Sequence, residues 1–172
     1  MKIKKIFIIV CMLLSFFSVA YAEKNPYELI IQNGHNEDVK AVRITRDMKY
    51  FVTGSDDRTI KIWTIDGKII RSIFAGQKVA DIFLSPDCSR IYARFETLNV
   101  VYVYSFNGEI IKRLELPESV QGITLSRDGL RFAAWTRFGQ MWIYDTRSWN
   151  KTSFSVEESY TEAQFNEEGA QI

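Results

Sequence analysis

Residues 39–63 read VKAVRITRDMKYFVTGSDDRTIKIW, and this stretch contains the pattern that sets the fold. Apolar side chains stand two residues apart at Val42 and Ile44, which is the period of a β-strand with one buried face. A turn follows at Asp47, a second strand comes next, and a third strand ends in Trp63. The stretch therefore predicts three antiparallel strands joined by short turns.

The same pattern returns along the chain with a period of 40 or 41 residues. The copies begin at Val39, Val79 and Val120, and a truncated copy begins at Tyr160. A fourth strand can be read at the end of each full copy, at residues 69–74, 110–116 and 152–156. Four short strands per period of about 40 to 45 residues are typical of a β-propeller blade. The sequence therefore predicts an all-β fold, a partial β-propeller with three four-stranded antiparallel blades and the start of a fourth.

The expected repeats divide a single domain at residues 23–172. They lie near residues 33–74, 75–116 and 117–156, with a partial repeat at 157–172. Residues 27–32, YELIIQ, read as an outer strand that precedes the first repeat. Three blades and one strand cannot close a ring of about four to eight blades. We therefore expect a truncated piece of a longer protein, self-association through open propeller edges, or a chain that folds poorly alone.

Acidic residues occupy the first turn of each copy. They are Asp47, Asp87, Asp128 and Glu168. A calcium loop needs several oxygen ligands within about a dozen residues, so these widely spaced acids are expected to be turn residues. The chain has one histidine, and Cys88 is its only cysteine after residue 22, so neither a metal site nor a cofactor is expected.

Residues 1–22 have the pattern of a secretory signal peptide. Three lysines precede an apolar run, and residues 20–22 form a small-x-small cleavage site. The apolar run is shorter than the roughly 20 residues of a membrane-spanning helix. We therefore expect a helical signal peptide, contact with a membrane only if it stays uncleaved, and export to the periplasm or secretion.

The composition favours a folded domain and disfavours nucleic acid as a partner. Hydrophobic residues make up 47% of the chain and aromatic residues 14%, which is enough for a packed core. The 22 basic and 21 acidic residues nearly balance, and no basic block stands out. Nucleic acid and anionic membrane surfaces are therefore not expected to be the partner.

Three features of the first copy resemble the WD-repeat β-propeller family. They are the pair Gly34-His35, the turn at Asp47 and the stretch GSDDRTIKIW that ends in Trp63. The resemblance covers roughly residues 33–172; it is strongest in the first repeat, and the later repeats are degenerate. In the later repeats the aspartate of that stretch is replaced by Thr97 and Phe138.

The resemblance implies a structural hydrogen-bond network in the first repeat. Its members are His35, Asp57, Trp63 and a hydroxyl from Ser55 or Thr53, with Asp56 as a solvated neighbour. A buried indole N–H needs an acceptor, which a linked hydroxyl, imidazole and carboxylate can supply. The alternative is a catalytic triad with Ser55 as nucleophile, His35 as base and Asp57 as orienting acid. A serine inside a strand lacks the exposed turn and flanking glycines of a nucleophile elbow, so we expect no catalytic residues.

The function expected from this pattern is that of a non-enzymatic, exported scaffold that binds a protein or peptide. Loops at one mouth of the propeller vary freely between blades, and aromatic and arginine side chains commonly anchor interfaces. Arg137 and Phe138, in one of these loops, are the candidate partner-binding residues. The alternative for Phe138 is that its ring packs against the neighbouring blade. The alternative is an accessory or substrate-binding segment of a larger exported enzyme such as a peptidase.

Overall fold

The structure is a computed structural model that describes residues 34–155 and 162–166. All of these residues belong to one compact unit, Asn33–Ile172. They form strands and connecting turns, and among them no helix is long and apolar enough to cross a membrane. The expected signal-peptide helix at residues 1–22 and the expected outer strand at residues 27–32 lie outside the described residues.

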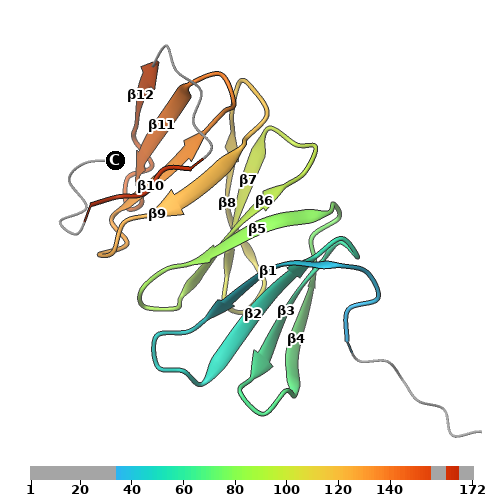
Figure 1. The fold of residues 1–172 in the computed structure, drawn as a ribbon. Coiled ribbons are helices and arrows are strands. Elements are labelled where there is room, and N and C mark those ends of the chain that lie inside the picture. The colour runs from blue at the N-terminus through green and yellow to red at the C-terminus, as the bar shows by residue number, and fades with distance from the viewer. Residues whose placement is uncertain (1–33, 156–161, 167–172) are drawn as a thin grey trace, which may run out of the picture. The chain divides into compact units, whose positions relative to one another are not determined.

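The strands form three four-stranded sheets, which we call blades 1, 2 and 3 (Figure 1). Blade 1 contains β1 (Val39–Ile44), β2 (Tyr50–Ser55), β3 (Thr59–Thr64) and β4 (Ile69–Phe74). Blade 2 contains β5 (Val79–Leu84), β6 (Arg90–Phe95), β7 (Val100–Ser105) and β8 (Ile110–Glu115). Blade 3 contains β9 (Gly122–Leu125), β10 (Arg131–Trp135), β11 (Gln140–Asp145) and β12 (Lys151–Ser155).

Within each blade the strands pair antiparallel and in chain order. The predicted all-β fold with three four-stranded antiparallel blades is therefore confirmed. The predicted start of a fourth blade is not seen as a strand, because residues 162–166 have no regular secondary structure. The hairpin expected around Glu168 lies outside the described residues.

The turn between the first two strands has the same construction in every blade. A hydroxyl donates to the aspartate two residues later, at 2.7 Å in blade 1, 2.5 Å in blade 2 and 2.6 Å in blade 3. These pairs are Thr45 with Asp47, Ser85 with Asp87, and Ser126 with Asp128. Each aspartate also accepts a backbone N–H two residues further on. The interpretation of Asp47, Asp87 and Asp128 as turn residues is confirmed, and Glu168 lies outside the described residues.

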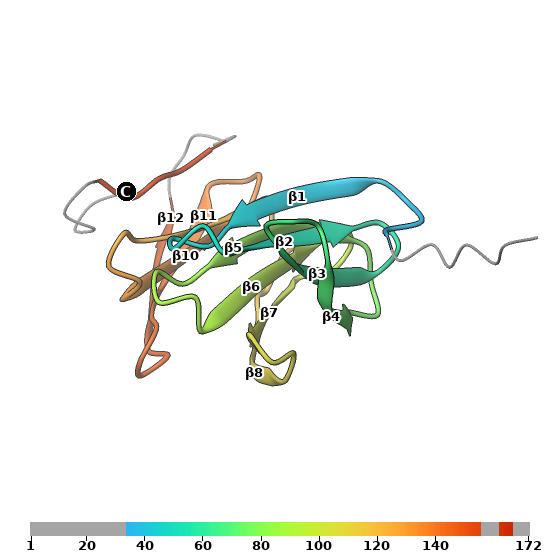
Figure 2. The ribbon, with the colours of Figure 1, turned by 90° about the horizontal axis from the view of Figure 1, so that it is seen from below.

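The blades stack on one another through apolar side chains. The inner strand β1 lies against β5, and β5 lies against β9 (Figures 1 and 2). One core joins blades 1 and 2, and a second joins blades 2 and 3. Gly54 is required at the first contact, because a Cβ at this position would lie 2.5 Å from Cγ1 of Val79.

One face of blade 1 has no neighbouring blade among the described residues, and we call it the open face. Two of its side chains, Val39 and Val42, are 47% and 50% exposed. Their equivalents in the later blades are Val79 and Ile82, both 0% exposed, and Val120 and Ile123, both 2% exposed. The same positions are therefore buried wherever a preceding blade covers them.

Candidate functional site

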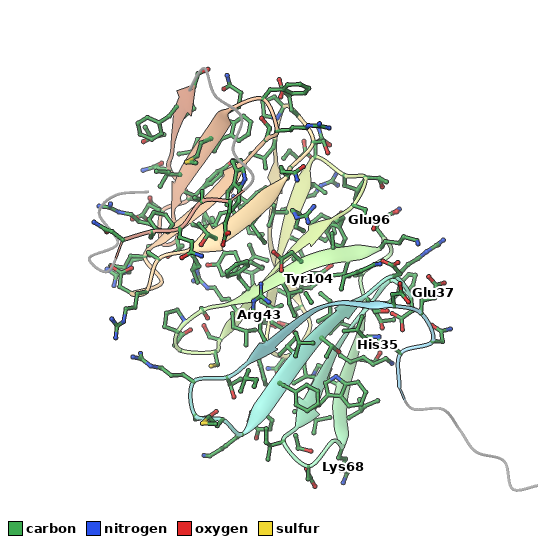
Figure 3. All side chains as sticks on the ribbon, in the orientation of Figure 1. His35, Glu37, Arg43, Lys68, Glu96 and Tyr104 are labelled. Carbon is green, nitrogen blue, oxygen red and sulfur yellow. The ribbon has the colours of Figure 1, made fainter. Side chains whose placement is uncertain are left out.

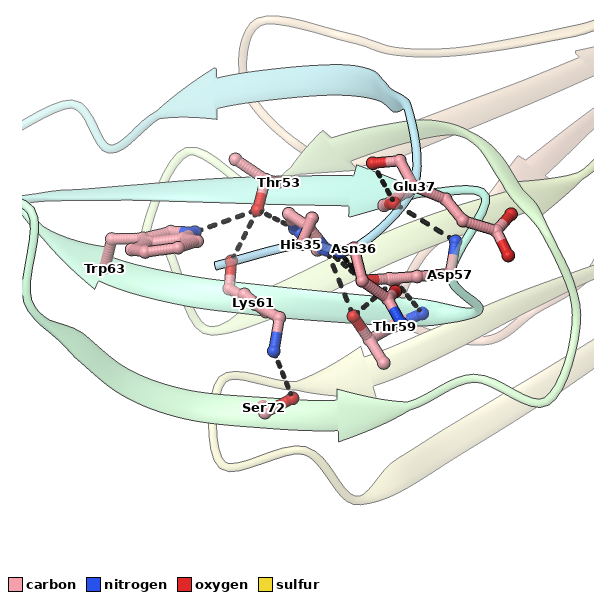
Figure 4. A network of polar contacts seen from close by, with 10 residues as sticks. His35, Asn36, Glu37, Thr53, Asp57, Thr59, Lys61, Trp63 and Ser72 are labelled. Carbon is pink, nitrogen blue, oxygen red and sulfur yellow. Dashed lines mark hydrogen bonds and ion pairs between the residues drawn. The ribbon is translucent and has the colours of Figure 1, made fainter. Parts of the chain in front are cut away.

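The structure brings together His35, Thr53, Asp57 and Trp63 in blade 1 (Figure 4). His35 lies in the loop before β1, and its Nε2 is 2.6 Å from Oγ1 of Thr53 in β2. Its Nδ1 is 2.7 Å from Oδ2 of Asp57, in the turn between β2 and β3. Trp63, in β3, donates its indole N–H to the same Thr53 hydroxyl at 2.8 Å. The contacts tie a loop, two strands and a turn into one network.

The hydrogen-bond roles along this network follow from the donors that each group has. The ionised carboxylate of Asp57 can only accept, so Nδ1 of His35 carries the proton between them. In the neutral ring Nε2 then accepts, and the Thr53 hydroxyl donates to it at 2.6 Å while accepting the indole N–H of Trp63. We assign this tautomer because it gives each of the four side chains in the network a hydrogen-bond partner.

The carboxylate of Asp57 is held by several donors at once. Burial alone would raise its pKa, but hydrogen bonds from Thr59 and His35 outweigh burial and lower the pKa to about 2. The Thr59 hydroxyl donates to Oδ1 at 2.6 Å, and its backbone N–H donates to the same atom at 2.9 Å. Asp57 is therefore ionised in the folded protein at ordinary pH.

Ser55 is not the hydroxyl that links Trp63 to His35. Its Oγ donates to the carbonyl oxygen of Glu37 at 3.3 Å and accepts the backbone N–H of Asp57 at 3.1 Å. The hydroxyl of Thr53 links Trp63 to His35. Its hydrogen bond to His35 also uses the Nε2 atom with which a catalytic base would bind its nucleophile. Ser55, His35 and Asp57 therefore do not have the geometry of a nucleophile, base and orienting acid.

Asp56 is buried rather than solvated, which corrects the sequence-based expectation. It is 8% exposed, and its Oδ2 lies 3.4 Å from Nζ of Lys40 and 3.5 Å from Nζ of Lys78. Lys78 comes from the loop that leads into blade 2, so this ion pair joins two blades. The sequence did not indicate these ion pairs, because Lys40 and Lys78 are too far from Asp56 in the sequence to form a characteristic pattern with it.

Blades 2 and 3 have no equivalent of this network. Alanines, Ala93 and Ala134, stand at the position of Thr53, and Tyr104 and Tyr144 stand at the position of Trp63. Both tyrosines are buried, and burial raises the pKa of each. Within the two described stretches, no cluster of histidine, cysteine and acidic side chains could hold a metal ion.

Arg137 and Phe138 lie in the turn between β10 and β11, away from the network. The ring of Phe138 is 79% exposed, so it does not pack against a neighbouring blade. Together with Glu118, Ser119 and Gln121 the two side chains line a hollow of about 380 Å³. Figure 3 shows Glu37, before β1, and Lys68, in the turn between β3 and β4, at opposite ends of blade 1. In each blade the turn between the second and third strands lies at the end equivalent to that of Glu37, and Arg137 and Phe138 are in this turn of blade 3.

The sequence did not indicate a second hollow, which lies among the inner strands. It measures about 490 Å³ and is lined by residues of β1, β5, β9 and the segment 162–165. Within it, the guanidinium of Arg43 pairs with Asp81 at 2.9 Å and lies 4.6 Å above the ring of Phe83. Asp81 and Phe83 are 38 and 40 residues from Arg43 in the sequence, which is about the length of one repeat. These side chains meet because equivalent strands of neighbouring blades lie side by side.

Comparison with known proteins places the first repeat in a named family. The family described as "WD domain, G-beta repeat" matches residues 27–64. A ribosome biogenesis protein BOP1 homolog of Aedes aegypti is 37% identical over 59 residues, which cover 34% of this chain and 7% of the relative. The Drosophila melanogaster homolog is 36% identical over 61 residues, covering 35% and 8%. Protein HIR1 of Kluyveromyces lactis is 24% identical over 147 residues, covering 74% and 17%.

These relatives correct the expectation that the chain is exported. The BOP1 homologs are named for ribosome biogenesis, a process inside cells, so periplasmic or secreted localisation is contradicted. None of the three relatives carries the name of a peptidase. The chain spans between 7% and 17% of the length of these curated relatives. Its first repeat matches the WD-repeat family, and its three four-stranded blades agree with that match.

Proposed function

We propose that this chain is a non-enzymatic scaffold that binds a protein or peptide through loops at the Glu37 end of its blades. The observation that carries the proposal is the exposure of Phe138, 79%, beside Arg137 in a turn of blade 3. Aromatic and arginine side chains are the most frequent anchors of protein interfaces. An exposed phenylalanine next to a hollow therefore favours this turn as a contact surface.

The hydrogen-bond network of blade 1 has a structural part in this proposal. It fixes the loop before β1 against β2 and β3, so the loops at the same end start from a rigid base. Rigid loops lose less conformational entropy when they bind a partner. His35, Thr53, Asp57 and Trp63 thus support binding without touching the partner.

The proposal is tested by capturing partners with the full chain and with two variants of the exposed turn, Phe138→Ala and Arg137→Ala. A matched control is Met48→Ala, because Met48 is also exposed but lies in the turn between β1 and β2, at the other end of the blade. We expect specific partners to be lost with the two turn variants and kept with Met48→Ala. Recovery of the same proteins by all four chains would contradict the proposal.

A further inference from the structure

We propose that the hollow beside Phe138 binds an extended peptide, with an apolar side chain against the Phe138 ring and an adjacent acidic side chain on Arg137. This rests on the scaffold function proposed above and adds the site and the chemistry of the ligand. The hollow measures about 380 Å³, which is enough for one or two side chains.

One wall of the hollow is a turn that is equivalent to the turn of blade 1 with Asp57. Phe138 in blade 3 corresponds to Asp57 in blade 1, and the turns are built alike. The backbone N–H of Asp57 donates to the Ser55 hydroxyl at 3.1 Å, and that of Phe138 donates to the Thr136 hydroxyl at 3.3 Å. In blade 1 the Asp57 side chain then turns inward onto His35. The Phe138 side chain is 79% exposed instead, so its ring is available to a ligand.

The walls of the hollow are held in place from both sides. The loop 116–121 is anchored at its start by Asn99, whose side-chain amide donates to the carbonyl oxygen of Leu116 at 2.8 Å. At its end the backbone N–H of Gln121 donates to the carbonyl oxygen of Trp135 at 2.8 Å. The facing turn is closed by a 2.9 Å bond from the N–H of Thr136 to the carbonyl of Gln140. A peptide would therefore meet a preformed site, which keeps the entropic cost of binding low.

The charges around the hollow favour an acid in the ligand. Neither Arg137 nor Glu118 has an ion-pair partner in the part of the chain that the structure describes. Arginine presents a planar fork of donors that matches a carboxylate, and it is enriched at interfaces, whereas glutamate is depleted there. Arg137 is therefore the anchor, and Glu118 on the opposite wall restricts the acid to the Arg137 side.

A random peptide-display library panned against the full chain tests this inference. We expect the selected peptides to share an acidic residue next to an aromatic or aliphatic one. Arg137→Glu should reverse the charge preference, so that basic residues replace the acid, and Phe138→Ala should weaken binding of the original peptides about tenfold or more. Glu118→Gln should strengthen it. Arg127→Glu is the matched control, since Arg127 is an exposed arginine of blade 3 in the turn at the other end.

The outcomes separate this inference from the scaffold function. Selected peptides that bind Arg137→Glu and Phe138→Ala as well as the unchanged chain would overturn the site and leave the scaffold function standing. A library that yields no binding peptide would overturn the site and count against peptide binding as a whole. Circular dichroism of each variant checks the fold, which we expect to be retained because all four changed side chains are exposed.

Discussion

Replacing Thr53 by valine tests whether the network stabilises blade 1. The change keeps the β-branched shape that suits β2 and removes only the hydroxyl. The Trp63 N–H then loses its acceptor at 2.8 Å, and Nε2 of His35 loses its donor at 2.6 Å. A buried polar group without a partner costs about 1 to 3 kcal/mol, so we expect the free energy of unfolding to fall by about 2 to 4 kcal/mol.

The assay is urea unfolding followed by circular dichroism, with Thr152→Val as the control. Thr152 lies exposed in the edge strand β12, so the same chemical change there should have little effect. Combining Thr53→Val with Trp63→Phe gives a double-mutant cycle, in which a shared hydrogen bond should appear as a coupling of about 1 kcal/mol. Additive losses, or a Thr53→Val loss no larger than that of Thr152→Val, would refute the reasoning.

Three further changes test other parts of the fold. Because its pKa is lowered to about 2, Asp57 should contribute stability that is fully present above about pH 4 and is lost as the pH falls toward 2, by about 2 kcal/mol. Urea unfolding across this range should show that slope, and Asp57→Asn should reduce it. Gly54→Ala should lower the free energy of unfolding by about 1 to 3 kcal/mol, because its Cβ would strike the next blade; Gly34→Ala, with nothing within 4 Å, should have little effect. Cys88 has a φ of 57°, a left-handed conformation, and Gly129 stands at the same position in blade 3. Cys88→Gly should therefore raise the free energy of unfolding by roughly 0.5 to 1 kcal/mol. Thermal unfolding measures this, and a lower melting temperature would contradict it.

The fold was readable from the sequence because its signals are local and repeated. Apolar residues two positions apart, such as Val42 and Ile44, give the strand period, and an aspartate such as Asp47 marks the turn that follows. The same signals recur with a period of 40 or 41 residues, so each copy supports the assignment of the others. The structure has a sheet at each of the three full copies.

The network was only partly readable, and the reason lies in strand geometry. Thr53 and Ser55 are two residues apart in β2, so both side chains point to the same face, and the period cannot distinguish them. The choice depends on where the loop with His35 crosses that face, which is a tertiary property. Ser55 lies further along, where it bonds the carbonyl of Glu37 instead of the imidazole.

Asp56 and Phe138 show two different limits of sequence reasoning. Asp56 follows a strand in a turn, where carboxylates are usually exposed, and its burial depends on lysines from β1 and from the start of the next blade. For Phe138 the sequence left open whether the ring packs on a neighbouring blade or faces outward. The repeat aligns Phe138 with Asp57, whose side chain faces inward onto His35, whereas the side chain of Phe138 is exposed.

Blade 1 and the later blades are held in different ways, and the open face explains why. In blades 2 and 3 the residues Tyr104 and Tyr144 are covered by the preceding blade and are 2% and 4% exposed, so burial alone can hold them. Trp63 stands at the same position in blade 1, on the open face, and remains partly exposed. There it stacks on Phe51 with ring centroids 5.6 Å apart and donates to Thr53. All of these contacts lie within blade 1 and the loop before it, so they need no preceding blade. Protonation of Asp57 at low pH should therefore weaken the contacts within blade 1, whereas cavity-forming substitutions should act mainly on the contacts between blades.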